Sequence, residues 1–222
     1  MSLEDFTGDR ALQARLDQVV DQLAVEFDGI YDRDEIRALV DESAAQLTSG
    51  QVAGFVPILA HRFARERLRA QAQADGRLAK TVAEVLFVSL TGAGRAQMGA
   101  ALLARRAGEA VVVHSAGSHA FGGVDESVLT AMEEIGIDMA DAFTRPLTPE
   151  VLAGADVVVT MGRSVGAVEV PPETRHVEWR VGDPAGADLF EVRRVRDDID
   201  RRVESLTAEL LERVSASRSS AV

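Results

Sequence analysis

Residues 84–98 read Glu84-Val85-Leu86-Phe87-Val88-Ser89-Leu90-Thr91-Gly92-Ala93-Gly94-Arg95-Ala96-Gln97-Met98. The apolar run 85–88 predicts a short buried strand, a turn of small residues follows, and strong helix formers occupy positions 96–106. A strand, a glycine-bearing loop and a helix in this order direct several backbone N–H groups at one point. The positive end of the helix dipole lies at the same place. The stretch therefore predicts a loop that can hold an oxyanion.

Two side chains complete this candidate site. Arg95 is expected where the loop becomes helix, and its planar guanidinium suits two oxygens of a tetrahedral anion. Ser89 is expected at the end of the strand, facing the loop, where a nucleophile would be placed. The loop residues expected to bind the anion together with Arg95 are Leu90, Thr91, Gly92, Ala93 and Gly94.

The composition is typical of a protein with a real core and excludes thiol chemistry. The chain has 222 residues, of which 46% are hydrophobic and 27% charged. No apolar run approaches the roughly 18 to 20 residues that span a bilayer, and the N-terminal stretch 1–10 is too polar for a secretory signal. We expect a soluble, cytoplasmic protein. The absence of cysteine excludes disulfides, thiolate metal sites and thiol nucleophiles, and neither a metal nor a cofactor is predicted.

The formal net charge is −12 with histidine neutral. A field of this sign repels nucleic acid and anionic membranes, so neither is an expected partner. An anion site in such a chain must work by local geometry rather than by long-range attraction.

Residues 8–75 are predicted to be helical throughout. The first helix is marked by an apolar stripe that ends before Gly29, and Asp32 or Asp34 can cap the second. Thr48-Ser49-Gly50 breaks the pattern, and a third helix is expected from Phe55 to Ala74. The members of its inner stripe are Ile58, Leu59, Phe63 and Leu68. These helices predict a small three-helix bundle as a first domain, 1–80.

The third helix carries a basic run of Arg62, Arg65, Arg67 and Arg69. One interpretation is a nucleic-acid face, as in small helical DNA-binding proteins. The other is a solvated face with ion pairs between residues four apart, such as Arg62 with Glu66. The acidic net charge favours the solvated face.

From residue 81 onwards strands and helices alternate. Further strands are expected at 111–114, 157–160 and 176–179, with helices at 128–135 and 189–214 and a frayed tail at 215–222. This alternation is typical of an α/β domain with a doubly wound, parallel four-stranded sheet. The second domain is therefore predicted to span 81–222.

At this point several separated segments resemble one known family. They are 85–98, Ser115-Ala116-Gly117, Gly136-Ile137, the run 155–161 and Asp183-Pro184-Ala185-Gly186. Together they look like the low-molecular-weight protein tyrosine phosphatase fold, and within it the arsenate reductase branch, over roughly 82–214. The bundle before them resembles the helical extension of some arsenate-reductase-like proteins.

The resemblance implies roles for three residues. In that family a loop of cysteine, five residues and arginine opens the first helix, and the cysteine thiolate attacks phosphorus or arsenic. An Asp-Pro pair late in the chain supplies the general acid in the phosphatases. Carried over by position, the nucleophile is Ser89, the anion-binding arginine is Arg95 and the acid is Asp183. Asp183 is also read as part of an ordinary turn before the last helix.

The departures from the family pattern fall on the chemistry. Ser89 replaces the cysteine, Gly92 stands where the phosphatases usually carry a bracing asparagine, and Ala96 replaces a hydroxyl residue. The stretch 162–168 holds no thiol, although the reductases need further cysteines to pass a disulfide outward. Loss of the nucleophile alone would be typical of an engineered trap variant, whereas all these losses together favour natural divergence. Reduction of arsenate by the family mechanism is therefore excluded.

Three hypotheses remain for the function. The first is a catalytically impaired homologue, a pseudoenzyme, that binds phosphate, sulfate or arsenate, or a phosphorylated protein. The second is a slow phosphatase that uses Ser89, Arg95 and Asp183. The third is an interaction module, such as a homodimer, with a vestigial pocket in which Arg95 pairs with an internal carboxylate. Whether the chain is an enzyme stays open among these hypotheses.

Overall fold

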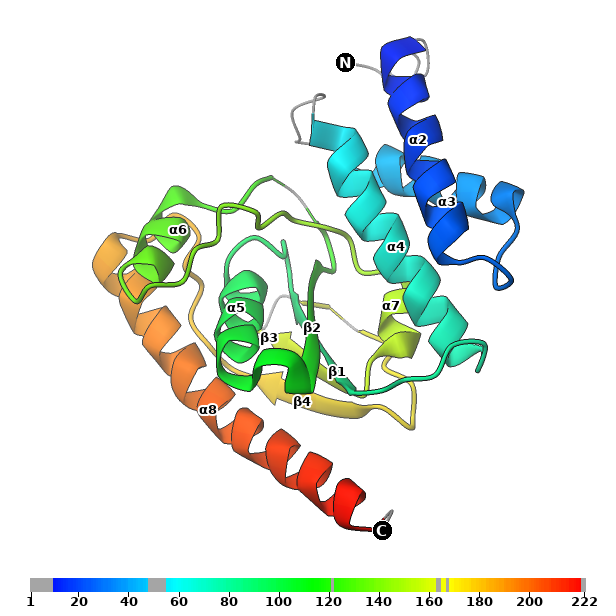
Figure 1. Ribbon diagram of the computed structural model, residues 1–222. Helices are drawn as coiled ribbons and strands as arrows, with labels where there is room; N and C mark the ends of the chain where they lie inside the picture. Colours follow the sequence, from blue (N-terminus) through cyan, green and yellow to red (C-terminus); the bar gives the residue numbers. More distant parts are fainter. Residues whose placement is uncertain (1–9, 48–54, 121, 163–164, 167, 221–222) are drawn as a thin grey trace. The chain divides into compact units, whose positions relative to one another are not determined.

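The computed structural model describes residues 10–47, 55–120, 122–162, 165–166 and 168–220 of the chain (Figure 1). The chain divides into two compact units, Met1–Ala79 and Lys80–Val222. Each unit is described below by itself.

The first unit contains three described helices, α2 (Arg10–Glu26), α3 (Arg33–Leu47) and α4 (Val56–Ala74). The predicted break at 48–50 lies outside the described residues. Before α3 the carboxylate of Asp32 accepts the N–H groups of Asp34 and Glu35 at 2.9 and 2.8 Å, and Glu35 in turn accepts the N–H of Asp32 at 2.8 Å. This reciprocal arrangement is a capping box, so Asp32 rather than Asp34 caps the helix.

Two expectations for α4 were wrong. Ile58 was assigned to the inner stripe but is 53% exposed. Arg67 was assigned to an exposed basic face but is 2% exposed. The Arg67 guanidinium donates to Glu42 at 3.0 Å and to Ser43 at 3.2 Å, and it lies over the ring of Phe63. A long apolar stem and a charge that finds a partner allow an arginine to be buried in this way.

The second unit is built on a parallel sheet of four strands. The strands are β1 (Ala83–Ser89), β2 (Val111–Gly117), β3 (Val157–Met161) and β4 (Arg175–Trp179), in the order β2-β1-β3-β4. This confirms the predicted four-stranded parallel sheet. Because β1 pairs on both sides and is buried almost throughout, the loop that follows it emerges at the middle of the sheet.

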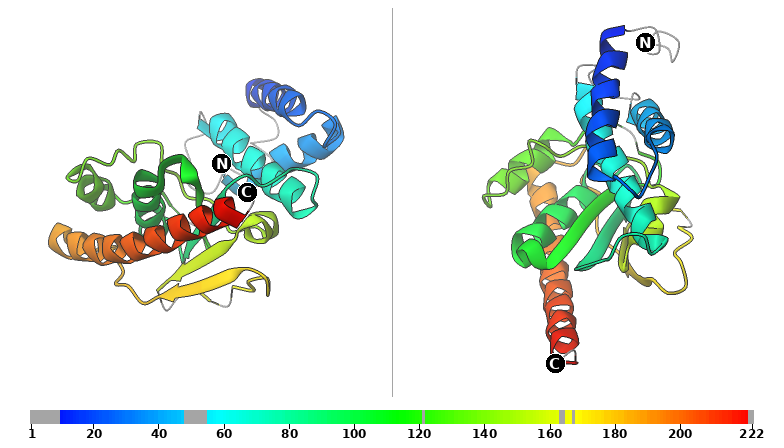
Figure 2. Two further views of the ribbon diagram at one scale, coloured as in Figure 1. Left: turned by 60° about the horizontal axis from the view of Figure 1, so that its bottom comes forward. Right: turned by 45° about the vertical axis from the view of Figure 1, so that its right-hand side comes forward.

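Helices cover both faces of this sheet, as a doubly wound fold requires. Helices α5 (Arg95–Ala107), α6 (Glu126–Glu133) and α8 (Leu189–Ser220) pack on one face through the larger hydrophobic cluster, and Figure 2 shows α8 running alongside α5. The opposite face packs against α7 (Pro149–Gly154), which the sequence pattern did not predict. A short 3₁₀ turn, Gly108–Ala110, joins α5 to β2. The fold class is therefore α/β.

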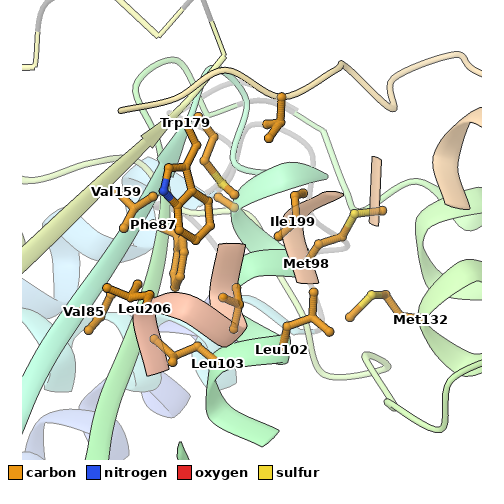
Figure 3. Close-up of a cluster of buried hydrophobic side chains, with 14 of the residues drawn as sticks. Val85, Phe87, Met98, Leu102, Leu103, Met132, Val159, Trp179, Ile199 and Leu206 are labelled. Carbon is orange, nitrogen blue, oxygen red and sulfur yellow. The ribbon is translucent and has the colours of Figure 1, made fainter. Parts of the chain in front are cut away.

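The larger cluster anchors the elements around the predicted loop. Phe87 of β1 lies against Trp179 of β4, with ring centroids 5.7 Å apart, and Met98 of α5 is fully buried beside them (Figure 3). Helix α8 supplies a stripe that runs as far as Leu210. The helix ends at Ser220, six residues beyond the predicted end, so the tail expected at 215–222 is helical over its described part.

Candidate functional site

The candidate site begins where β1 ends. Ser89 is the last residue of β1, so it lies at the edge of the sheet where the strand stops, and it is 1% exposed. The Ser89 hydroxyl accepts the backbone N–H of Gly92 at 3.1 Å, and the hydroxyl of Thr91 accepts that of Ala93 at 3.3 Å. The loop therefore curls back over the end of its own strand. Among the described residues, no imidazole lies within hydrogen-bonding distance of the Ser89 hydroxyl.

Glycine makes the close packing of this loop possible. Gly92 has φ +72°, and a Cβ there would lie 2.7 Å from the backbone nitrogen of Gly117 at the end of β2. A Cβ on Gly117 would in turn meet the carbonyl of Thr91. Two backbone hydrogen bonds join the same segments. The N–H of Ser118 donates to the carbonyl of Ser89 at 3.0 Å, and the N–H of His119 donates to the carbonyl of Leu90 at 2.8 Å. The loop lies directly on β2, with no side chain between them.

Helix α5 begins at the end of this loop without a side-chain cap. Gly94 is its N-cap residue and offers no side-chain acceptor, and the first turn contains no acidic residue. The first N–H groups of a helix have no acceptor within the helix, and the helix dipole makes this end positive. The start of α5 is therefore suited to a negatively charged ligand.

Arg95 is the first residue of α5 and its side chain is only 7% exposed. Its Nη2 lies 2.9 Å from Oδ2 of Asp183, whose side chain is 54% exposed. The guanidinium also lies against Gly162, where φ is +92° and a Cβ would collide with Nη1. The structure thus gives Arg95 one fixed position beside the loop.

The segment that carries Asp183 is packed against the same loop. A Cβ on Gly94 would lie 2.8 Å from Cγ of Pro184. Asp183 also accepts the N–H of Ala185 at 3.2 Å, as expected of an aspartate in a turn. The structure therefore brings together Ser89, the loop 90–94, Arg95 and Asp183, which were predicted from segments 88 residues apart.

The sequence analysis missed Gln97. This side chain is 6% exposed, and its amide donates to the carbonyl oxygens of Gly92 at 3.0 Å and Phe143 at 2.9 Å. A polar residue among the buried positions of a helix was the only available signal, because Phe143 lies far along the chain.

Among the described residues, no group of three or more histidine, cysteine, aspartate or glutamate side chains is arranged to hold a metal ion. None of the described helices combines the length and the apolar character needed to cross a membrane.

This geometry agrees with the comparisons to known proteins. The chain belongs to the low molecular weight phosphotyrosine protein phosphatase family, whose family model matches residues 84–216. A second model, described as the N-terminal domain of protein-tyrosine-phosphatase-like proteins, matches residues 16–72.

Within this family the chain is similar to arsenate reductases. It is 34% identical over 122 residues to the arsenate reductase of Bacillus cereus (strain Q1), covering 54% of this chain and 90% of that protein. The structure of the thioredoxin-dependent arsenate reductase of Corynebacterium glutamicum matches with a TM-score of 0.79 and 33% identity, covering 88% of this chain and 96% of that one. A structure described as an arsenate reductase in the phosphate binding state matches with a TM-score of 0.52 and 28% identity, over 58% of this chain and 99% of that one. The predicted family is confirmed.

Proposed function

We propose that the chain binds a tetrahedral oxyanion, such as phosphate, arsenate or sulfate, at the loop 89–95, and that it does not turn the anion over by a cysteine mechanism. The observation that carries this proposal is the buried Arg95 guanidinium, held beside an uncapped helix N-terminus. Arg95 is paired with the Asp183 carboxylate, as the hypothesis of a vestigial pocket expects, so a bound oxyanion has to displace this carboxylate. An arsenate reductase in the phosphate binding state, with the same fold, supports the same class of ligand.

The side chains at this site do not support turnover by a cysteine mechanism. A serine hydroxyl is almost entirely protonated at neutral pH, unlike a cysteine that a loop of this kind can ionise. Among the described residues no histidine is hydrogen-bonded to the Ser89 hydroxyl, and the chain contains no cysteine to receive or pass on a disulfide. The backbone amides and Arg95 do not depend on the missing thiols, so binding can persist where reduction cannot.

The test is a calorimetric titration of the full chain with phosphate and with arsenate at low ionic strength, where screening is weak. We expect saturable heat at one site per chain. Arg95→Ala should weaken binding by at least about 100-fold, because hydrogen bonds to charged groups contribute about 1.5–3 kcal/mol each. Arg106→Ala is the matched control, since Arg106 lies on the same helix as Arg95 and forms a surface ion pair with Asp200 of α8.

Each result has a definite meaning. Binding that is lost in Arg95→Ala and kept in Arg106→Ala supports the site. Full affinity in Arg95→Ala would contradict it, and absence of heat with either anion would favour the vestigial pocket and an interaction role.

A second candidate function is slow phosphoryl transfer, favoured by the ion pair that places Asp183 next to Arg95. In this reaction the oxygen of Ser89 bonds to phosphorus as the bond to an aryl leaving oxygen breaks. The protonated form of the Asp183 carboxyl gives its proton to the leaving oxygen, and the serine proton passes to a phosphoryl oxygen. Water then attacks phosphorus as the bond to the Ser89 oxygen breaks. The Ser89 oxygen takes its proton back from the phosphoryl oxygen, the Asp183 carboxylate takes a proton from the water, and phosphate leaves. Release of phosphate from an aryl phosphate that is lost in Ser89→Ala would establish this activity.

The remaining expectations stay predictions. They are a phosphorylated protein as ligand, a homodimer and a cytoplasmic location.

A further inference from the structure

Gln97 uses both hydrogens of its side-chain amide on backbone carbonyl groups. It is the third residue of α5, faces the interior, and donates to Gly92 at 3.0 Å and to Phe143 at 2.9 Å. A glutamine so deeply buried is stable only because these bonds are made. Its place in the structure is therefore determined by the loop on one side and by the segment of Phe143 on the other.

The bond to Gly92 fixes the orientation of a peptide group within the loop. Peptide bonds are planar and trans here, so a carbonyl that points at Gln97 directs the N–H of Ala93 the opposite way. The preceding peptide group is fixed as well, because the N–H of Gly92 is bonded to Ser89. Both peptide groups around Gly92 are thus held in one orientation.

Gly92 has no means of holding this conformation itself. Glycine adopts positive φ freely but also many other conformations, and its loop position has no side chain to restrain it. Here a Cβ would lie 2.7 Å from the nitrogen of Gly117, so the restraint must come from another residue.

The other acceptor of Gln97 belongs to a segment tied to the end of β2. Gly117 donates to the carbonyl of Arg145 at 2.9 Å and accepts from the N–H of Leu147 at 2.9 Å. The guanidinium of Arg145 donates to the carbonyl of Ser115 at 2.8 Å. Gln97 therefore connects the loop to a segment that is itself fixed on the strand where the loop rests.

We propose that Gln97 is the positioning residue that holds loop 90–94 in its anion-binding conformation. The expected effect of Gln97 on anion affinity rests on the proposed function. Its effect on the loop conformation can be measured without any anion.

The first test replaces Gln97 by methionine, which has a similar volume and no N–H donor. In Gln97→Met we expect faster hydrogen exchange at the amide of Gly92 and about tenfold weaker phosphate binding, the loss of about one to two hydrogen bonds. Thr174→Val is the matched control, because it removes a buried bond from Thr174 to the carbonyl of Ala155 before β4, at the opposite edge of the sheet. The control should keep the exchange rate in the loop and the affinity of the unchanged chain.

The second test is Gln97→Glu, with sulfate as the probe because its charge is constant between pH 5 and 8. A protonated glutamic acid offers one O–H donor in nearly the shape of glutamine, whereas an ionised one faces two carbonyl oxygens. We therefore expect sulfate affinity, relative to the unchanged chain at the same pH, to recover as the pH falls. Repulsion between the ionised carboxylate and sulfate would give the same trend in affinity, so exchange at the amide of Gly92 is also followed without anion, relative to the unchanged chain at the same pH. This exchange should slow as the pH falls only if residue 97 holds the loop.

The outcomes separate the two proposals. Unchanged exchange at Gly92 and unchanged affinity in a folded Gln97→Met would overturn the role of Gln97. If the unchanged chain binds no anion but Gln97→Met still loses protection at Gly92, the positioning role stands and the proposed function fails.

Discussion

At the scale of single residues, the site is defined by one charge pair across the second unit. Arg95 is nearly buried while Asp183 is half exposed, so the two partners differ in freedom. The arginine is fixed between the loop and Gly162, whereas the aspartate is held only by its turn. Asp183 supplies the oxygen that Arg95 binds in this structure.

It follows that Asp183 competes with an external anion. We predict that Asp183→Asn strengthens phosphate binding about two- to fivefold in the calorimetric titration, since a half-exposed ion pair contributes on the order of 1 kcal/mol or less. Asparagine can still accept the N–H of Ala185, so the turn should be retained.

The control for this prediction is Asp188→Asn, which removes the same charge from the same segment at the cap of α8. A similar gain of affinity in both variants would mean that general charge, not competition, is responsible. Weaker binding in Asp183→Asn would contradict the prediction.

At the scale of elements, α4 places side chains in very different environments within about three turns. Arg67 is buried with its partners, Ile58 is exposed, and His61 is partly covered. Burial lowers the pKa of His61 below its usual value of 6.5, and the nearby Arg65 lowers it further, while Glu26 opposes them. The imidazole is therefore held neutral in the folded unit.

A depressed histidine pKa makes this unit less stable in acid. Because the unfolded chain binds the proton more readily, the contribution of His61 is fully present above about pH 6.5 and decreases as the pH falls through that value. We predict that the free energy of unfolding of the helical unit is smaller at pH 5 than at pH 7, and that His61→Gln reduces this difference. The measurement is urea unfolding followed by emission of Tyr31, the only tyrosine, which is buried in this unit. An unchanged pH dependence in His61→Gln would exclude the histidine as its source.

At the scale of the whole molecule, the two units have separate hydrophobic interiors. The helical unit buries its own stripes, and the sheet unit has clusters on both faces of its sheet. Every residue assigned to the candidate site lies in the sheet unit, Lys80–Val222. The net charge of −12 disfavours anions at long range, so any affinity must arise from the local arrangement at the loop.

We therefore predict that residues 80–222 fold alone and bind phosphate with the affinity of the full chain, within a factor of about three. Unfolding can be followed through Trp179, the single tryptophan, which is buried in the larger cluster of this unit. A fragment that folds but no longer binds phosphate would show that the site depends on the helical unit.

The sequence by itself determined the parallel α/β sheet, the family, the loop with Ser89 and Arg95, and the second helix boundary at Asp32 or Asp34. These features are written in local patterns: apolar runs, glycines where φ is positive, and capping residues close to the helices they cap. The resemblance to the phosphatase family implied a role for Asp183, which the fold brings to Arg95.

Only the tertiary structure decided how these parts contact one another. Gln97 donates to the carbonyl of Phe143, which lies 46 positions further along the chain, and the burial of Arg67 depends on Glu42 of another helix. Such contacts depend on strand order and helix packing, which place distant residues side by side without leaving a periodic signal in the chain. For the same reason the sequence predicted the anion-binding loop but not the hydrogen bond of Gln97 to it. It also placed Arg67 on an exposed basic face, although this side chain is buried.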